Sequence, residues 1–76
     1  MAIKPQAVPR ECFARNLQDA RLRLGLSQQQ LAHRCGLSRT EVSLFERRAR
    51  SPRLEMIVAL SRALGVEPGE LLQGID

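Results

Sequence analysis

The sequence predicts an all-α domain of five short helices, and three observations carry that prediction. Apolar residues recur at intervals of three and four, which is the spacing of one helix face. Ser27 and Ser38 are followed three residues later by Gln30 and Glu41, the pattern of a capping box that opens a helix. Glycines stand where the periodic stretches stop, and no stretch predicts a strand. The 76 residues have room for one small domain.

A tail over residues 1–9 is expected before the first helix, because this stretch contains two prolines and no periodic apolar pattern. Gly25 is the expected end of that helix, since glycine enters the left-handed backbone region at little cost. The expected inner face of the helix consists of Phe13, Leu17, Ala20 and Leu24.

The second and third helices are predicted as a closely joined pair, separated only by Gly36 and Leu37. The second runs from Ser27 to Cys35, and the third runs from Ser38 to about Arg47. Two short helices joined this tightly cannot lie side by side, so they should cross steeply, as in a helix-turn-helix. Their expected inner residues are Leu31, Ala32 and Cys35 in the second helix, and Val42 and Phe45 in the third.

A fourth helix is expected after Pro52 and a short fifth helix after Glu67, ending at Leu71 and Leu72. The inner face of the fourth helix is predicted to hold Leu54, Ile57, Val58, Leu60, Ser61 and Leu64. The folded domain is therefore expected over residues 10–73, with a tail over residues 74–76.

Basic residues outnumber acidic ones by twelve to eight, and eleven of the twelve are arginine. Six arginines fall between Arg34 and Arg53 against two glutamates, whereas residues 54–76 carry one arginine against four acidic residues. One end of the molecule is therefore predicted to be basic, as in an oriented surface that binds a polyanion. The guanidinium group suits phosphate and guanine, although a GC-rich genome also favours arginine codons.

Cys12 and Cys35 are too few for a disulfide framework, and both are expected to be buried free thiols. His33 has no second ligand at metal spacing and is expected on the surface, so no metal or cofactor is predicted. No catalytic triad, paired-carboxylate cleft or glycine-rich phosphate loop appears, which argues against an enzyme. The sequence also lacks a membrane-length apolar run and a signal peptide, so we expect a cytoplasmic protein.

One spacing pattern persists through all five predicted helices, from about Phe13 to Leu72. It comprises Arg21, Gly25-Leu26-Ser27-Gln28, Leu31-Ala32, Gly36-Leu37-Ser38, Val42-Ser43, Phe45-Glu46, Pro52 and Ala63-Leu64-Gly65-Val66. The pattern resembles the Cro/repressor-type (XRE) helix-turn-helix family of phage repressors and bacterial regulators. That resemblance implies a five-helix, lambda-repressor-like fold and a sequence-specific transcriptional regulator that binds double-stranded DNA with its third helix in the major groove.

The resemblance also implies which residues contact DNA. Its base-reading positions fall on Arg39, Thr40, Ser43 and Leu44. Its phosphate-binding positions fall on Ser27, Gln28, Ser38, Arg47, Arg48 and Arg50. The chemistry of these residues agrees: N–H groups at a helix start bind phosphate, Arg39 can chelate guanine, and Thr40 or Leu44 can contact a thymine methyl group.

Three further expectations concern the shape of the site. The resemblance implies that Arg21 and Glu46 pair, which would link the first helix to the end of the third. Glu41 is expected to close the capping box with Ser38 rather than to accept from a cytosine. Arg48 stands where the family usually has glycine, so the turn after the third helix must bend without one.

We expect the domain to bind a twofold operator as a homodimer, because one helix of this size reads only a few base pairs. The best candidates for a self-complementary apolar patch lie at the acidic C-terminal end: Val66, Leu71, Leu72 and Ile75. Lys4 and Arg10 are expected in a mobile tail rather than in an arm around DNA.

With no residues left for an effector domain, we expect a phage Cro-like repressor, a restriction–modification controller or an antitoxin, the last of which would add a protein toxin as partner. The alternative outside DNA binding is a protein-interaction module on the same scaffold. Such a module would not need the arginine cluster between Arg34 and Arg53, which favours the DNA-binding interpretation.

Overall fold

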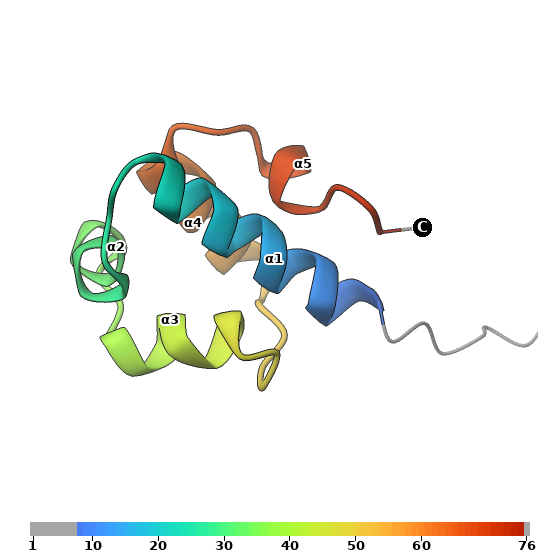
Figure 1. Ribbon diagram of the computed structural model, residues 1–76, viewed down its shortest axis with the longest axis horizontal. Coiled ribbons are helices and arrows are strands. Elements are labelled where there is room, and N and C mark those ends of the chain that lie inside the picture. The colour runs from blue at the N-terminus through green and yellow to red at the C-terminus, as the bar shows by residue number, and fades with distance from the viewer. Residues whose placement is uncertain (1–7, 76) are drawn as a thin grey trace, which may run out of the picture.

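The computed structural model describes residues 8–75, and these residues form five helices and no strand. The helices are α1 (Val8–Arg23), α2 (Gln28–Cys35), α3 (Arg39–Glu46), α4 (Leu54–Leu64) and α5 (Pro68–Leu71). In Figure 1, α1 crosses the front of the molecule, α3 forms its lower edge and α5 lies above α1. The all-α, five-helix prediction is confirmed. Within the described range, no helix has the length and apolar character that crossing a bilayer requires.

The ends of α1 differ from the predicted ones. The helix begins at Val8, ahead of the expected domain start at residue 10, so Pro9 and Arg10 lie in its first turn. Proline is tolerated there, because the first N–H groups of a helix have no partner within it. The remaining residues of the predicted tail, 1–7 with Lys4 among them, lie outside the described residues.

The C-terminal end of α1 lies at Arg23, and Gly25 adopts the left-handed conformation with φ of +69°, as predicted for the stop. The assignment of Leu24 to the inner face is wrong: its side chain is 49% exposed. Because the helix has already ended, the helical periodicity no longer directs this residue inward. Leu26 packs against the core instead.

The core joins α1 to α3 and is closed by α5. Phe13 of α1 and Phe45 of α3 meet edge to face, with ring centroids 6.0 Å apart and an interplanar angle of 90°. Leu71 of α5 is only 1% exposed. The other large apolar side chains that are fully buried are Leu17, Leu31, Val42 and Leu60.

The fourth helix buries Leu60, Ser61 and Leu64, as predicted. Ile57 and Val58 are half-buried. The prediction that Leu54 faces inward is wrong, since its side chain is 72% exposed. Leu54 is the first residue of α4, and among the described residues it is not one of those that pack in or against the core.

The segment after α5 packs along α1. Asn16 donates its amide Nδ2–H groups to the carbonyl oxygens of Leu71 at 3.0 Å and Gln73 at 2.9 Å, across more than 50 residues of chain. A Cβ at Gly74 would lie 3.3 Å from the Cys12 Sγ atom. Within the predicted tail 74–76, Gly74 therefore touches α1, and Ile75 is half-buried.

Both cysteines are free thiols, as predicted, but the prediction that both are buried is wrong for Cys35. Cys12 is buried, whereas Cys35 at the end of α2 is half-buried. Burial raises the pKa of the Cys35 thiol, because the charged thiolate is less well solvated there. Near neutral pH the protonated, less reactive form is therefore favoured.

Candidate nucleic-acid interface

Each helix of the α2–α3 pair opens with the predicted capping box. The Ser27 Oγ atom accepts from the Gln30 backbone N–H at 3.0 Å, and the Gln30 side chain accepts from the Ser27 N–H at 2.8 Å. Ser38 and Glu41 form the equivalent pair at 3.2 and 3.1 Å, which confirms the capping role of Glu41. Gly36 ends α2 at φ +71°. Both helix starts are thus fixed by local hydrogen bonds.

The third helix has one buried and one outward face. Val42 and Phe45 are buried and hold α3 against the core. In Figure 1 the helix lies along one edge of the molecule. The implied base-reading residues lie on the side that is not buried: Arg39 and Thr40 are exposed, and Ser43 and Leu44 are half-buried. The structure therefore gathers all four on one accessible surface.

The implied phosphate-binding residues lie on both sides of that surface. Ser27 and Ser38 are exposed at the starts of α2 and α3, and Arg47, Arg48 and Arg50 are exposed in the loop after α3. Gln28 is half-buried, and its amide Nε2 donates to the Glu46 Oε1 atom at 3.2 Å. One Gln28 donor is therefore already occupied within the protein.

The loop after α3 bends through Arg48, whose φ of +65° makes it the one non-glycine residue with positive φ among those described. The Arg48 N–H donates to the Phe45 carbonyl at 3.1 Å, and the Ala49 N–H donates to the Leu44 carbonyl at 2.9 Å. These are the two bonds of a Schellman motif, which usually places glycine at the left-handed position. The turn is therefore made without glycine, at a conformational cost of about 1–2 kcal/mol.

Changing Arg48 to glycine is expected to raise the free energy of unfolding by about 1 kcal/mol, since glycine adopts this conformation without steric strain. The same change removes a positive charge beside α3 and should weaken binding to duplex DNA. Urea denaturation and salt-titrated DNA binding measure the two effects. Arg48→Ala is the matched control, because it removes the charge but keeps the Cβ atom. It should weaken DNA binding without raising the free energy of unfolding. A less stable Arg48→Gly protein would contradict the backbone argument.

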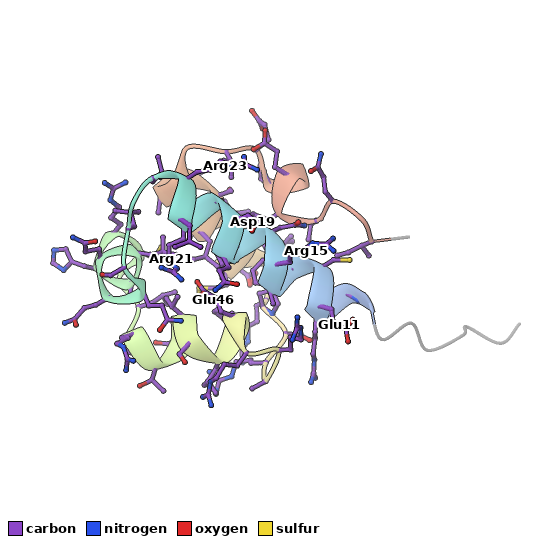
Figure 2. All side chains as sticks on the ribbon, viewed as in Figure 1. Glu11, Arg15, Asp19, Arg21, Arg23 and Glu46 are labelled. Carbon is purple, nitrogen blue, oxygen red and sulfur yellow. The ribbon has the colours of Figure 1, made fainter. Side chains whose placement is uncertain are left out.

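Arg21 and Glu46 form a bidentate ion pair between α1 and α3 (Figure 2). Arg21 Nε donates to Glu46 Oε2 at 2.7 Å, and Nη2 donates to Oε1 at 2.9 Å. The side chains are 9% and 4% exposed. Arg21 also donates to the Leu26 carbonyl at 2.7 Å, while Gln28 donates to Glu46. We call these four residues the Arg21–Glu46 cluster; it joins the end of α1, the start of α2 and the end of α3.

The structure changes the set of residues available for a dimer interface. Leu71 is 1% exposed within the core of its own chain, so its assignment to a self-complementary surface patch is wrong. Leu72 is 38% exposed, and Val66 and Ile75 are half-buried. Leu72 and Ile75 line one groove together with Ile57 and Pro52, whereas Val66 lines a different groove between α1 and α5.

One surface contact has no counterpart in the sequence pattern. Arg10 lies in the first turn of α1, and its Nε atom donates to the Ser51 Oγ atom in the α3–α4 loop at 2.7 Å. The two residues are 41 positions apart, and neither belongs to a local motif that predicts the contact.

The arrangement of all five helices can now be compared with known proteins. A family model, described as Helix-turn-helix (HTH_3), matches residues 17–71, from the middle of α1 to the end of α5. This chain belongs to the Cro/repressor-type (XRE) helix-turn-helix family. It is accordingly a DNA-binding transcriptional regulator, of a family that is not enzymatic, and the lambda-repressor-like fold class is confirmed.

Individual relatives of this helix-turn-helix regulator agree with the family assignment. The control protein C.BamHI of Bacillus amyloliquefaciens is 41% identical over 61 residues, which cover 79% of this chain and 75% of that protein. The hypothetical transcription factor NHTF from Neisseria superimposes with a TM-score of 0.84 at 38% identity, covering 95% of this chain and 84% of that one. The restriction-modification controller protein C.AhdI from Aeromonas hydrophila gives a TM-score of 0.79 at 40% identity, covering 82% and 94%.

Proposed function

We propose that this regulator binds a twofold DNA operator as a homodimer in the cytoplasm and inserts α3 of each copy into the major groove. The observation that carries the proposal is the outward face of α3, which is flanked by the start of α2 on one side and an arginine-rich loop on the other. A groove-reading helix needs an accessible face between two sets of backbone-binding groups, and this surface provides both.

Base reading is assigned to the four accessible residues of α3. Arg39 is the first residue of the helix, and its exposed guanidinium can donate two hydrogen bonds to guanine O6 and N7. Thr40 is exposed beside it and offers both a hydroxyl and a methyl group. Ser43 and Leu44 lie one turn further along α3 and are half-buried. Their side chains can therefore contact only those base edges that lie close to the helix.

Phosphate binding is assigned to residues that border α3. At Ser27 and Ser38, the helix-start N–H groups carry partial positive charge that favours an anion. The loop adds the exposed charges of Arg47, Arg48 and Arg50. Gln28 contributes a neutral donor, and its hydrogen bond to Glu46 holds the amide in one orientation. These contacts would fix the register of α3 without carrying sequence information themselves.

The dimer is proposed on the apolar surface around Leu72 and Ile75, which share a groove with Ile57. Val66 is the remaining candidate, on a separate groove. A twofold dimer would place the two α3 helices about one turn of DNA apart, roughly 34 Å. Sedimentation equilibrium is expected to show a dimer on DNA, and a monomer both on and off DNA would overturn this part of the proposal.

Among regulators of this family, we propose the role of a controller protein. Two of the relatives, at 41% and 40% identity, are named as controllers, one of them of a restriction–modification system. Dimerisation and DNA binding both follow mass action, so the activity of such a controller would depend on its own concentration.

Changing Arg39 to alanine is expected to relax specificity at one base position in each half-site, by about 1–3 kcal/mol, because a bidentate contact to guanine is lost. Selection of binding sites from random duplex DNA, performed with the native protein and with Arg39→Ala, measures the effect position by position. Arg23→Ala is the matched control, since Figure 2 places Arg23 on the opposite side of the molecule from α3.

Two outcomes separate the parts of this proposal. An Arg39→Ala site profile equal to the native one would remove Arg39 from base reading while leaving DNA binding intact. A native protein that shows no salt-sensitive binding to random duplex DNA would overturn DNA binding through this surface, and would favour the protein-interaction module instead.

A further inference from the structure

We propose that Arg10, in the first turn of α1, is an additional phosphate-binding residue of the DNA-binding surface, and that Ser51 holds it in place. The inference rests on the proposed function. It extends the DNA-binding surface to α1, which contains none of the DNA-contacting residues proposed above. The contact that carries it is the 2.7 Å hydrogen bond from Arg10 Nε to Ser51 Oγ.

This hydrogen bond attaches the start of α1 to the arginine-rich loop. Ser51 lies between Arg50 and Arg53, and all three line one groove beside the end of α3. Ser51, Arg10 and Pro52 also line the groove that contains Leu72 and Ile75, so the surface proposed for the dimer borders the arginine-rich loop. Arg10 is therefore connected to the loop through a residue that both grooves share. In Figure 2, nitrogen-tipped side chains gather along the lower edge of the molecule, beneath α3 and near the start of α1.

The charges around this contact favour an anionic ligand. Residues 47–53 contain four arginines and no acidic residue, and Arg10 brings a fifth positive charge to them. Glu41, the one acidic residue that lines the groove of Arg50 and Arg53, accepts hydrogen bonds from Ser38. The Ser51 hydroxyl is neutral and leaves the charge of Arg10 uncompensated, whereas Glu46 neutralises Arg21. Positive charges placed together repel one another, and a polyanion that lies across all of them removes this repulsion.

The remaining donors of Arg10 suit a phosphate group. A guanidinium carries five N–H donors, and the bond to Ser51 uses the one on Nε. The Nη1 and Nη2 groups make no hydrogen bond with any residue in the range 8–75, and the Arg10 residue is exposed. Because Ser51 already restricts the side chain, less rotamer freedom is lost when a phosphate binds.

The test is the salt dependence of binding to a short random-sequence duplex. In Arg10→Gln, the slope of log affinity against log salt concentration should become shallower by about 0.9 per bound protomer. The native-to-variant affinity ratio should accordingly shrink about 3.5-fold per protomer between 50 and 200 mM salt. Arg10→Lys keeps the charge and should retain the native slope. Thermal unfolding of each variant verifies that the domain is folded.

Arg23→Gln is the matched control, because it removes the same charge from the other end of α1, on the side of the molecule away from α3 (Figure 2). Its slope should equal that of the native protein. An unchanged slope in Arg10→Gln, or an equal change in both variants, would overturn the phosphate contact even though the native protein binds DNA. A native protein without salt-sensitive binding would instead overturn the proposed function itself.

The role of Ser51 is tested by a double-mutant cycle on the same duplex. Ser51→Ala should weaken binding in the native background and have no further effect in Arg10→Gln, because Ser51 acts through Arg10. Additive losses would show that Ser51 does not position Arg10.

Discussion

Replacing Glu46 with alanine is expected to lower the free energy of unfolding by about 3–5 kcal/mol, because a buried guanidinium would lose its counter-charge. Arg21 and Glu46 are 9% and 4% exposed, and two hydrogen bonds of 2.7 and 2.9 Å join them. In the variant, Arg21 keeps its bond to the Leu26 carbonyl, but Gln28 also loses its acceptor. Since native proteins are stable by only about 5–15 kcal/mol, this loss is a large part of the total, and the variant should unfold at a lower denaturant concentration.

Chemical denaturation monitored by circular dichroism measures this loss. Glu55→Ala is the control, because Glu55 is an exposed acidic residue in the first turn of α4 and its removal should change stability by less than about 0.5 kcal/mol. The double variant Arg21→Met with Glu46→Leu should recover most of the loss, since no unpaired charge remains buried. If Glu46→Ala is no less stable than Glu55→Ala, the Arg21–Glu46 cluster does not stabilise the fold.

Replacing Phe45 with alanine is expected to cost about 3–5 kcal/mol, through lost apolar burial and the cavity that remains. Phe45 is 3% exposed and meets Phe13 edge to face, so the change removes an aromatic contact between α3 and α1. The loss should be largest for α3 itself, and hydrogen exchange should show faster exchange of its amides than of those in α4.

Leu22→Ala is the matched apolar control, because Leu22 is 57% exposed and buries little surface. Phe45→Leu should cost less than Phe45→Ala, since it leaves a smaller cavity. Uniform exchange across all helices in Phe45→Ala would contradict a specific anchoring role for this residue.

The local elements of this fold could be predicted because their causes are local. The two capping boxes depend on residues three positions apart, and the glycine at position 36 marks the end of α2 by its own backbone preference. Leu24 and Leu54 could not be placed by periodicity, because that pattern describes one helix and not where its neighbours end. The sequence pattern places Leu71 in a surface patch, but the residue closes the core against α1, across most of the chain length.

In the candidate site, too, the features with local causes could be predicted from the local sequence, and those that depend on distant residues could not. The accessible face of α3 follows from its helical spacing, since Val42 and Phe45 must point inward and leave the opposite side outward. Only the family resemblance predicts the pairing of Arg21 with Glu46, because two residues 25 positions apart share no local motif. The contact of Arg10 with Ser51 required the three-dimensional arrangement of α1 and the α3–α4 loop.

The left-handed residue at the end of α3 also has a genetic consequence. Every arginine codon becomes a glycine codon by a single-base change, so one point mutation at Arg48 would relieve its unfavourable backbone conformation. The presence of arginine rather than glycine at position 48 is therefore not explained by glycine being difficult to reach by mutation. Arginine occupies this position although a single mutation could remove its conformational cost. This is expected where selection acts on the charge of the side chain more strongly than on folding stability.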